Sequence, residues 1–494
     1  MLTAGIIIIG DEILNGRVTD SISSFLCQRF HTIGVRTKRI GVIADDIDAI
    51  ASDVKSFSES FDIVVTTGGV GPTHDDVTYE AVARAFGTAL RVDDQMKKLF
   101  AWYMMDGDPS AEKLITIPSI AEVLVVDLEV LLGPSNKYPV VKTKNVFNFP
   151  GIPSYTKALF AAMEQKYFQD SSNFFLSRDI YLSVGEILVL PALNAIVSEY
   201  QNRVSFGSYP LIDDHRDERY VTKIYIESSS LTDCLNAETA LLRRLPPQWY
   251  VPARRQKPNL DLIGKLMQTD CELASVMKSS FQIIKQCFEE YDSSEMFLCF
   301  NGGKDCTVLL TLVYYFWKSK KIRFPLQLLY FHDPDSFPEV DSFITEVTTN
   351  YHVDLETLPV PMKASLIEFL QKEKTKKVCF LGQRNSDPRS KNLKPVQETD
   401  SDWPKLIRIF PILDWSYKNI WDFIRCANIP YCSLYDRGFT SLGTKKNTGV
   451  NPALKIMDSV KEDCYLPAFL LSDEDCEREG RFELDSGAGS GTHQ

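Results

Sequence analysis

The segment Asn301-Gly-Gly-Lys-Asp-Cys-Thr307 combines residue types that can grip a phosphate chain. It follows an apolar run, Met296 to Phe300, and precedes a stretch with helical spacing. Two glycines let the backbone approach an anion closely, and the free N–H groups at a helix start point toward it. Lys304 adds a positive charge, and Asp305 can hold or orient a magnesium ion. The pattern predicts a nucleotide-phosphate loop, although an ordinary strand-to-helix turn uses the same residue types.

The spacing of this loop differs from that of the Walker loop, which needs four residues between its first glycine and Gly-Lys. A Gly-Gly-Lys-Asp loop after a first strand instead resembles the PP-loop of ATP pyrophosphatases, which cleave ATP between its α and β phosphates. The resemblance implies transfer of AMP, with pyrophosphate as the leaving group. Thr307 offers a further hydroxyl to the phosphates.

Three further segments are expected where an open α/β sheet grips a second substrate, at the carboxyl ends of strands. They are Gly382 to Pro388, Leu413 to Phe423 and Leu434 to Gly443. With the loop, they resemble the eukaryotic FAD synthase family, also called FMN adenylyltransferases, which is related to the PAPS reductases. The resemblance runs from about Gln282 to Arg481, and its run Tyr-Asp-Arg-Gly-Phe-Thr-Ser-Leu-Gly is specific rather than generic.

The resemblance implies a role for each matching residue. The nucleotide is assigned to Asn301, Gly302, Gly303, Lys304, Asp305, Cys306, Thr307, Gly382 and Arg384. The flavin is assigned to Asp400, Trp421, Tyr435, Arg437, Gly438, Thr440, Ser441 and Gly443. The catalytic set is Lys304, Asp305, Asp387, Arg478 and Arg481, with Asp305 also the magnesium ligand. The two arginines would neutralise charge that builds on the FMN phosphate and the α-phosphate during transfer.

Each of these features also has a plainer structural interpretation. Trp421 can pack in a helix core as readily as it can contact flavin. Asp387 can belong to a turn, and Arg478 and Arg481 can be solvated charges on a helix face. The order and spacing of the four segments together favour the functional interpretation. Asn385 stands where the family tends to carry a basic residue, so part of the nucleotide contact set is expected to differ.

Three functions compete for the last domain. An FMN adenylyltransferase would use ATP, Mg²⁺ and FMN, and would release FAD and pyrophosphate without a covalent enzyme intermediate. A sulfonucleotide reductase would need a catalytic cysteine in a Glu-Cys-Gly type context, which neither Cys464 nor Cys476 has. A scaffold or a molybdenum-cofactor-binding protein would leave the C-terminal motifs unexplained. The sequence favours the adenylyltransferase.

A second constellation of glycines and carboxylates lies near the N-terminus. Its candidate site residues are Asp11, Glu12, Gly68, Gly69, Gly71, Asp75 and Asp76. Glycine-rich turns admit a phosphate or a pterin, and the four carboxylates can bind a divalent metal. The segments resemble a molybdopterin-binding domain and, with the region after them, the competence-damage-inducible family, whose members can hydrolyse dinucleotide pyrophosphates. A metal-dependent FAD pyrophosphatase and a fold kept only for stability or assembly both stay open.

The alternation of apolar runs and amphipathic segments shows which elements must position these motifs. Residues 1–168 predict an α/β domain with strands at 6–9, 40–43 and 63–67 and helices at 21–33 and 155–167. Residues 169–250 predict a small α+β domain with strands at 180–184, 204–209 and 220–226 and helices at 190–201 and 231–245. Residues 246–247 and 254–259 have the composition of a linker.

The last domain is expected over residues 251–484, with one long helix at 260–291 before the loop. Strands follow at 296–300, 326–331 and 378–381, with a helix at 340–351. Residues 485–494 have the composition of a disordered tail. The predicted fold class is thus α/β: two open, mostly parallel-sheet domains, one molybdopterin-binding-like and one like the PP-loop hydrolases, joined through a small α+β domain.

The composition of the chain limits its expected partners and its expected cellular location. Sixty-six acidic against 54 basic residues give a net charge of −12, which argues against nucleic acid as a partner. Eleven cysteines without C-x-x-C pairs suggest reduced thiols and a cytoplasmic location. The sequence contains no apolar run near the roughly 20 residues needed to span a membrane. The expected partners are ATP and FMN, apo-flavoproteins that receive FAD, and a second copy of the chain through the first domain.

Overall fold

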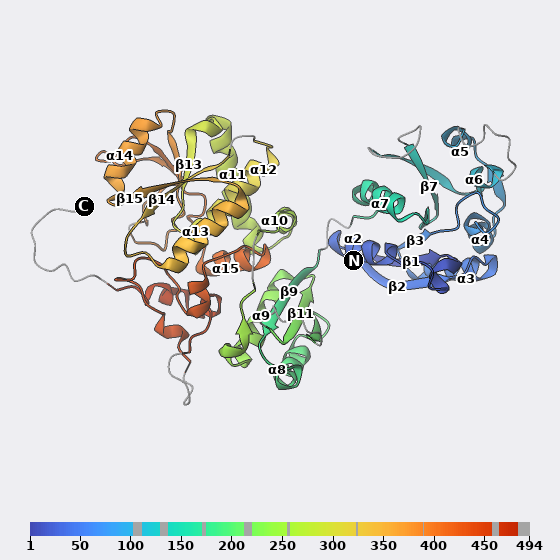
Figure 1. Ribbon diagram of the computed structural model, residues 1–494, viewed down its shortest axis with the longest axis horizontal. Helices are drawn as coiled ribbons and strands as arrows, with labels where there is room; N and C mark the ends of the chain where they lie inside the picture. Colours follow the sequence, from blue (N-terminus) through green and yellow to red (C-terminus); the bar gives the residue numbers. More distant parts are fainter. Residues whose placement is uncertain are drawn as a thin grey trace, which may run out of the picture. The chain divides into compact units, whose positions relative to one another are not determined.

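The computed structural model describes residues 1–101, 111–128, 137–169, 174–211, 220–253, 257–322, 325–388, 390–456 and 464–482. The chain divides into two compact units, Met1–Phe175 and Leu176–Gln494 (Figure 1). The predicted tail, residues 485–494, lies outside the described residues. Within the part described, no helix is both long and apolar enough to cross a membrane.

The first unit is built on a six-stranded sheet with the strand order β2-β1-β3-β8-β7-β6. Its strands are β1 (Thr3–Ile9), β2 (Arg36–Ile43), β3 (Ile63–Thr67), β6 (Glu122–Asp127), β7 (Lys137–Thr143) and β8 (Val146–Phe149). The first four in the order are parallel, and β7 and β6 are antiparallel to their neighbours. The predicted strand at 6–9 is confirmed as part of β1, in which the residues from Ala4 to Ile9 are all buried.

Helices cover both faces of this sheet. They are α1 (Asp11–Leu14), α2 (Ile22–Thr32), α3 (Ile47–Ser60), α4 (Thr78–Ala85), α5 (Asp94–Leu99), α6 (Ala111–Ile115) and α7 (Pro153–Tyr167). Leu26 of α2 and Phe160 of α7 pack in one apolar core, and Val54 of α3 and Val82 of α4 pack in another. A short pair, β4 (Leu90–Val92) and β5 (Thr116–Pro118), lies outside the main sheet.

The second unit begins with a small domain, residues 176–251. Its antiparallel sheet has the order β10-β11-β9-β12 and consists of β9 (Leu176–Leu182), β10 (Ser205–Pro210), β11 (Thr222–Ser228) and β12 (Tyr250–Val251). Alternate residues of β11 are buried, and α9 (Leu231–Arg244) packs against this strand, whereas α8 (Glu186–Glu199) packs against α9 and β10. The predicted linker at 246–247 is wrong, because η2 (Pro247–Trp249) leads directly into β12, which pairs with β9.

The rest of the second unit contains a six-stranded sheet with the order β15-β14-β13-β16-β18-β17. Its strands are β13 (Met296–Cys299), β14 (Gln327–His332), β15 (Asp354–Pro359), β16 (Val378–Phe380), β17 (Val396–Glu398) and β18 (Ile407–Ile409). All are parallel except β17. The predicted α/β class, with two mostly parallel sheets and a small α+β domain, is confirmed.

The helices of this part are α10 (Leu260–Leu266), α11 (Glu272–Glu290), α12 (Lys304–Ser319), α13 (Pro338–Tyr351), α14 (Met362–Lys372) and α15 (Tyr417–Cys426). The single long helix predicted at 260–291 is wrong. Thr269 donates its hydroxyl to the carbonyl of Leu266, and Cys271 caps a new helix by accepting the N–H of Ala274. These side chains satisfy the ends of two separate helices, α10 and α11.

Four 3₁₀ turns follow and complete the domain: η4 (Ser433–Arg437), η5 (Pro452–Leu454), η6 (Ala468–Leu470) and η7 (Glu474–Arg478). The turn η4 packs against η6, and η7 packs against α15. Residues distant in sequence therefore gather beside the loop between β13 and α12. All eleven cysteines are free thiols in the structure.

Candidate active site

The predicted strand, turn and helix around residue 301 are confirmed. β13 ends at Cys299, and α12 begins at Lys304 with Gly303 as its N-cap residue. Gly302 has a φ of 71°, a conformation that favours glycine. The side-chain oxygen of Asn301 accepts the N–H of Gly303 at 3.0 Å. The turn is therefore held by its own residues, and the start of α12 faces the carboxyl end of the sheet.

Four charged side chains form a buried network at this turn. Lys304 is 2% exposed, and its ammonium donates to Asp305 at 3.1 Å and to Glu477. Arg384, 1% exposed, lies between the same two carboxylates. It donates to both oxygens of Glu477 at 2.6 and 2.7 Å. Its Nε lies 2.6 Å from Asp305 Oδ1, an ion pair without the alignment of a hydrogen bond. Two cations thus share two carboxylates.

The charges of this network set the pKa of Asp305. Burial alone would raise the pKa, but the positive charges of Lys304 and Arg384 lower it below the ordinary value. The same surroundings keep Tyr435 protonated, because burial and the charge of Asp305 raise the pKa of its phenol well above normal. The Tyr435 hydroxyl oxygen accepts the backbone N–H of Lys304 at 2.9 Å. One helix-start N–H is therefore already bonded to the segment assigned to flavin.

The segment after β16 lies directly beside the loop. A side chain at Gly382 would place its Cβ 3.0 Å from the backbone of Cys306, so glycine permits this close approach. Asp387 accepts the backbone N–H of Arg384 at 2.9 Å, and its other oxygen lies 3.5 Å from Arg478. Burial and the charge of Asp305 raise the pKa of Asp387. The structure thus brings together three residues of the predicted catalytic set that are far apart in sequence.

Arg481 approaches from the end of the described chain. Its guanidinium lies against Gly443, where a Cβ would come within 2.4 Å of Nη2. Burial and the nearby charge of Arg478 lower the pKa of Arg481, and Tyr435 acts in the opposite direction. Two arginines therefore face the same region as Tyr435. Their mutual repulsion favours an anion between or beside them.

The Tyr435–Gly443 segment is held in place by contacts at Gly438 and Thr440. Gly438 has a φ of 90°, and a Cβ there would lie 2.5 Å from that of Tyr465. The hydroxyl of Thr440 donates to the carbonyl of Glu477 at 2.6 Å and accepts from Asn451 at 2.8 Å. The segment is thereby tied to η7, which carries Glu477 and Arg478. Ser441 and Gly443 follow on the same half-buried loop.

Some predicted residues lie elsewhere or are already engaged. The Thr307 hydroxyl is buried and donates to the carbonyl of Gly303 at 2.9 Å, so it is used within α12. Trp421 is 2% exposed and packs edge-on against Tyr435 at 5.3 Å, as its core interpretation requires. Arg437 is exposed and pairs with Glu339 of α13 at 2.6 Å. These three side chains are bonded to or packed against other parts of the protein, and their contacts with substrate stay predictions.

Asp400 is not brought to the loop by any contact within the described residues. It follows β17, at the end where the chain enters β18, whereas the loop lies at the carboxyl ends of the parallel strands. Its carboxylate is exposed and pairs with Arg408 at 3.3 Å. Asn385, the departure from the family pattern, donates to Asp414 at 2.8 Å. A flavin contact by Asp400 stays a prediction.

Sequence reasoning missed Glu477, which joins Lys304 to Arg384. It stands directly before Arg478 in an acidic stretch, Asp473 to Glu477, and such stretches are usually solvated surface. Its one local signal in the sequence is this position next to Arg478. Asn451 donates to the hydroxyl of Thr440 and to the carbonyl of Cys476. Sequence reasoning missed this residue as well. Their partners are remote in sequence.

Cys476 and Cys306, which lie on η7 and in the loop, both have raised pKa values. A hydrogen bond to Glu479 raises the pKa of Cys476 to about 11, so this thiol stays protonated near neutral pH. Cys306, inside the loop, is buried, and burial with the charge of Asp305 raises its pKa to about 12. Neither thiol is an activated nucleophile.

The N-terminal constellation also lies at the carboxyl ends of parallel strands. Gly68, with a φ of 106°, follows β3, and a Cβ there would lie 2.0 Å from the carbonyl oxygen of Ile9. Asp45, which follows β2, accepts the backbone N–H of Asp11 at 3.0 Å. Burial raises the pKa of Asp45, and the charges of Asp11, Glu12 and Asp75 add to the rise. Sequence reasoning missed Asp45.

Asp76 and Gly71 belong to a turn beside this constellation. Asp76 accepts the N–H of Thr73 at 2.8 Å, and a Cβ at Gly71 would lie 2.6 Å from its carboxylate. Gly69 has a φ of 64°, and a Cβ there would lie 2.4 Å from the hydroxyl of Thr78. Asp76 therefore accepts a hydrogen bond within its own turn, and a hydrogen bond from Thr73 of the same turn lowers the pKa of Asp75.

Neither site offers a preformed cage for a metal. Among the described residues, no group of three or more His, Cys, Asp or Glu side chains is arranged to hold an ion. Both oxygens of Asp305 face the cations Lys304 and Arg384. A divalent ion would compete with these charges, so Asp305 does not fit as the holder of a resident magnesium ion.

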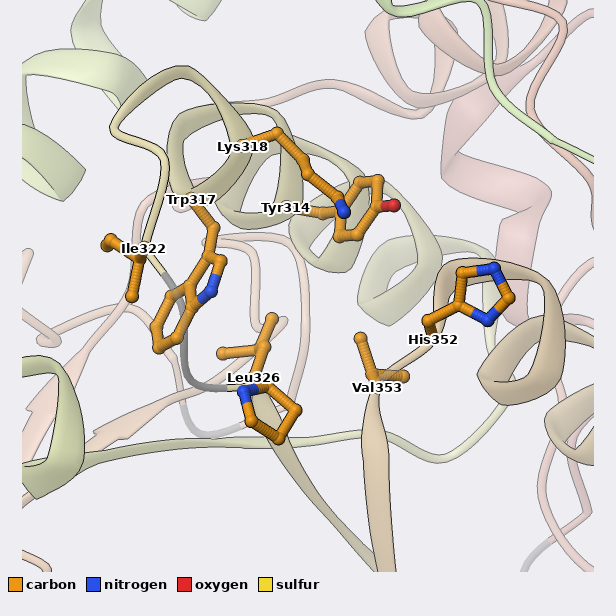
Figure 2. A pocket seen from close by; sticks show the side chains of 8 residues that line it. Tyr314, Trp317, Lys318, Ile322, Leu326, His352 and Val353 are labelled. Carbon is orange, nitrogen blue, oxygen red and sulfur yellow. The ribbon is translucent and has the colours of Figure 1, made fainter.

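A cavity of about 150 Å³ lies beside the C-terminal end of α12, where Trp317 forms part of its wall (Figure 2). Its wall is formed by Tyr314, Trp317, Lys318, Ile322, Pro325, Leu326, His352 and Val353. None of these residues belongs to the predicted sets. Since α12 runs from Lys304 to Ser319, this cavity is distinct from the phosphate loop.

Comparisons with known proteins match all three parts of the chain. Residues 5–169 match the model of a probable molybdopterin binding domain, and residues 174–254 match that of the FAD synthase middle domain. Residues 295–365 and 360–450 match the phosphoadenosine phosphosulfate reductase domain. These ranges agree with the two α/β domains and the small domain between them.

Relatives extend the match along the chain. A probable FAD synthase of Caenorhabditis elegans is 33% identical over 511 residues, covering 98% of this chain and 97% of that protein. A probable FAD synthase of Schizosaccharomyces pombe is 39% identical over 44% of this chain and 88% of its own length. The crystal structure of Candida glabrata FMN adenylyltransferase with FMN and the ATP analogue AMPCPP is 26% identical, over 46% of this chain and 95% of that one, with a TM-score of 0.43.

Proposed function

Since the chain belongs to the FAD synthase family, we infer that it is an adenylyltransferase that joins the AMP of ATP to FMN. The observation that carries this function is the match over 98% of the chain to a probable FAD synthase. The products are FAD and pyrophosphate. The enzyme is therefore a nucleotidyltransferase and not a reductase.

The mechanism that we propose needs no covalent enzyme intermediate. A phosphate oxygen of FMN attacks the α-phosphorus of ATP in line, the bond from that phosphorus to the bridging oxygen breaks, and the electron pair leaves with pyrophosphate. Lys304 and Arg384, at the start of α12 and beside it, suit the triphosphate. Arg478 and Arg481 suit the FMN phosphate and the α-phosphate. The protein acts mainly by positioning and by neutralising charge.

Magnesium is proposed to arrive with ATP as part of the substrate. The carboxylates beside the loop are paired with cations, which does not suit an ion bound in advance. Asp305 would then orient Lys304 and Arg384 rather than bind the metal. Its effect on the reaction passes through the placement of these two cations.

The test uses the whole chain with FMN, MgATP and two labels. Label in the α-phosphate of ATP should appear in FAD, and label in the γ-phosphate should appear in pyrophosphate. Asp305→Ala should abolish FAD formation, and circular dichroism should show that the fold is intact. Asp475→Ala, which removes an exposed carboxylate from η7, should not abolish FAD formation. Near-normal FAD formation by Asp305→Ala, or turnover only with another phosphate acceptor, would overturn the assignment.

A second activity, metal-dependent FAD hydrolysis, is proposed for the first unit. The observation that favours it is that Asp45 accepts the backbone N–H of Asp11 at the carboxyl ends of the strands, where burial and the charges of Asp11, Glu12 and Asp75 raise its pKa. Water would attack the pyrophosphate of FAD, giving FMN and AMP. In the full chain, Asp45→Asn should abolish hydrolysis with Mg²⁺, Mn²⁺ or Co²⁺ and spare FAD synthesis. If the unchanged chain binds these ions yet leaves FAD intact, the first unit is a structural domain.

The setting of the reaction is also a proposal. Eleven free cysteines suit the reducing cytosol. The FAD product would pass to apo-flavoproteins, and a second copy of the chain would pair through the first unit. Transfer of labelled FAD to an apo-flavoenzyme and sedimentation of the whole chain test the last two proposals.

A further inference from the structure

The small domain is joined to the domain that carries the loop by a buried ion triad. Glu238 of α9 accepts from Arg178 of β9 at 3.0 and 3.1 Å, and from Arg425 of α15 at 2.6 and 3.2 Å. The guanidinium of Arg178 also donates to the carbonyl of Arg425. All three side chains are at most 6% exposed. Because a buried charge needs its partner, the triad fixes α15 against the small domain.

A second contact lies outside the triad. Arg243, in the last turn of α9, donates to the carbonyl of Leu470 at 3.0 Å and to the hydroxyl of Ser472 at 2.8 Å. Tyr250 of β12 packs edge-on against Phe469 at 6.2 Å. The small domain therefore holds the short segment 469–472, as well as α15.

Both elements that the small domain contacts, α15 and segment 469–472, lead directly to the loop. On α15, one turn before Arg425, Trp421 packs against Tyr435, whose hydroxyl accepts the N–H of Lys304. Segment 469–472 continues into η7, which delivers Glu477 to the ammonium of Lys304.

α15 and the chain around segment 469–472 are also hydrogen-bonded to each other. Glu474 caps α15 by accepting the N–H groups of Tyr417 and Lys418 at 3.0 and 3.2 Å. The Tyr417 hydroxyl donates to the carbonyl of Ala468 at 2.8 Å. A shift of segment 469–472 would therefore move both η7 and the start of α15.

We propose that the small domain positions the adenylyl-transfer site, with Arg243 and Glu238 as positioning residues that act through segment 469–472 and α15 on Lys304. The inference rests on the proposed function and adds a role for the small domain in it. Neither residue contacts the loop. Their effect is to keep Glu477 and Tyr435 bonded to Lys304, so that the cation stays where pyrophosphate develops charge.

Arg243 and Arg244 offer a matched pair for the test. Both are exposed arginines in the last turn of α9, but among the described residues Arg244 bonds only within the small domain, to Glu199 at 2.9 Å and to the carbonyl of Ala240. Arg243→Ala should lower kcat for FAD formation roughly tenfold. The KM values for ATP and FMN should change by less than about twofold. Arg244→Ala should leave kcat and both KM values as in the unchanged chain.

Two further readouts separate positioning from loss of folded protein. Arg243→Lys keeps a donor for one of the two acceptors and should recover part of kcat, and the melting temperatures of Arg243→Ala and Arg244→Ala should agree. Equal kcat values for these two alanine variants, or a loss in Arg243→Ala that matches its unfolded fraction, would overturn the proposal. Failure of the unchanged chain to make FAD would instead refute the proposed function, so the two failures are distinct.

Discussion

The hydroxyl of Tyr435 accepts a hydrogen bond from the backbone N–H of Lys304, 2.9 Å away. The bond joins the specific Tyr-Asp-Arg-Gly run to the first residue of α12, across 131 positions of sequence. It uses an N–H that a helix start would otherwise present to an anion. The Tyr435–Gly443 segment and the nucleotide loop are therefore joined directly by a hydrogen bond.

Tyr435→Phe should lower kcat for FAD formation by about tenfold, because it removes this bond and keeps the ring against Trp421. The buried N–H of Lys304 loses its partner, so the free energy of unfolding should fall by about 1–3 kcal/mol. Steady-state kinetics and urea unfolding measure the two effects. Tyr431→Phe removes a hydroxyl that bonds Asp436 in the same segment and should not slow transfer. Equal kcat values in the two variants would show that the bond is not needed.

The loop could be predicted because all of its signals are local. An apolar strand, two glycines and a helix start are consecutive in sequence, and the positive φ of Gly302 is what such a turn requires. Cross-chain partners could not be predicted in this way. Glu477 meets Lys304 across 173 positions, and only the packing of η7 against α15 turns an acidic surface stretch into a buried bridge.

Competition for hydrogen bonds explains why Thr307 and the predicted helix at 260–291 differ from what the sequence predicts. A threonine hydroxyl in a phosphate loop looks available, yet Thr307 has the carbonyl of Gly303 within reach one helical turn earlier. Apolar spacing continues from Leu260 to Tyr291, but the side chains of Thr269 and Cys271 satisfy helix ends between them. Apolar periodicity predicts which face of a helix is buried, but it does not predict where capping ends the helix.

Glu477→Gln should strengthen inhibition by pyrophosphate about tenfold and lower the KM for ATP, because Lys304 and Arg384 lose a compensating charge. Slower product release should then lower kcat. Product inhibition measured by steady-state kinetics tests this. Asp475→Asn removes an exposed charge from the same turn and is the matched control. An unchanged inhibition constant for Glu477→Gln would mean that the bridge does not compete with phosphate.

Gly443→Ala should lower kcat/KM for FMN about tenfold, because its Cβ would lie 2.4 Å from Nη2 of Arg481 and displace the guanidinium. The melting temperature should hardly change, since the far end of an arginine can move. Gly185→Ala, with nothing within 4 Å of the added Cβ, controls for the substitution itself. A double-mutant cycle with Arg481→Ala gives the sharper result. The two losses should not add, and additive losses would separate Gly443 from Arg481.

The Glu238 triad predicts how stability of the second unit depends on pH. Burial alone would raise the pKa of Glu238, but Arg178 and Arg425 lower it to about 2, against 4.5 for the ordinary group. A depressed folded pKa stabilises fully above the unfolded pKa, and this stability is lost as pH falls through the folded value. The difference corresponds to about 3 kcal/mol, lost between roughly pH 5 and pH 2.

Glu238→Gln should remove this part of the acid dependence and destabilise the chain by about 3–5 kcal/mol at neutral pH, because two buried arginines lose their counterion. Urea unfolding of the second unit, followed at pH 7, 5 and 3, gives both quantities. Glu199→Gln removes the half-exposed partner of Arg244 and should keep the slope of the unchanged chain. If Glu238→Gln also keeps the full slope, the acid-sensitive group lies elsewhere. The triad would then hold α15 through its hydrogen bonds rather than through its charge.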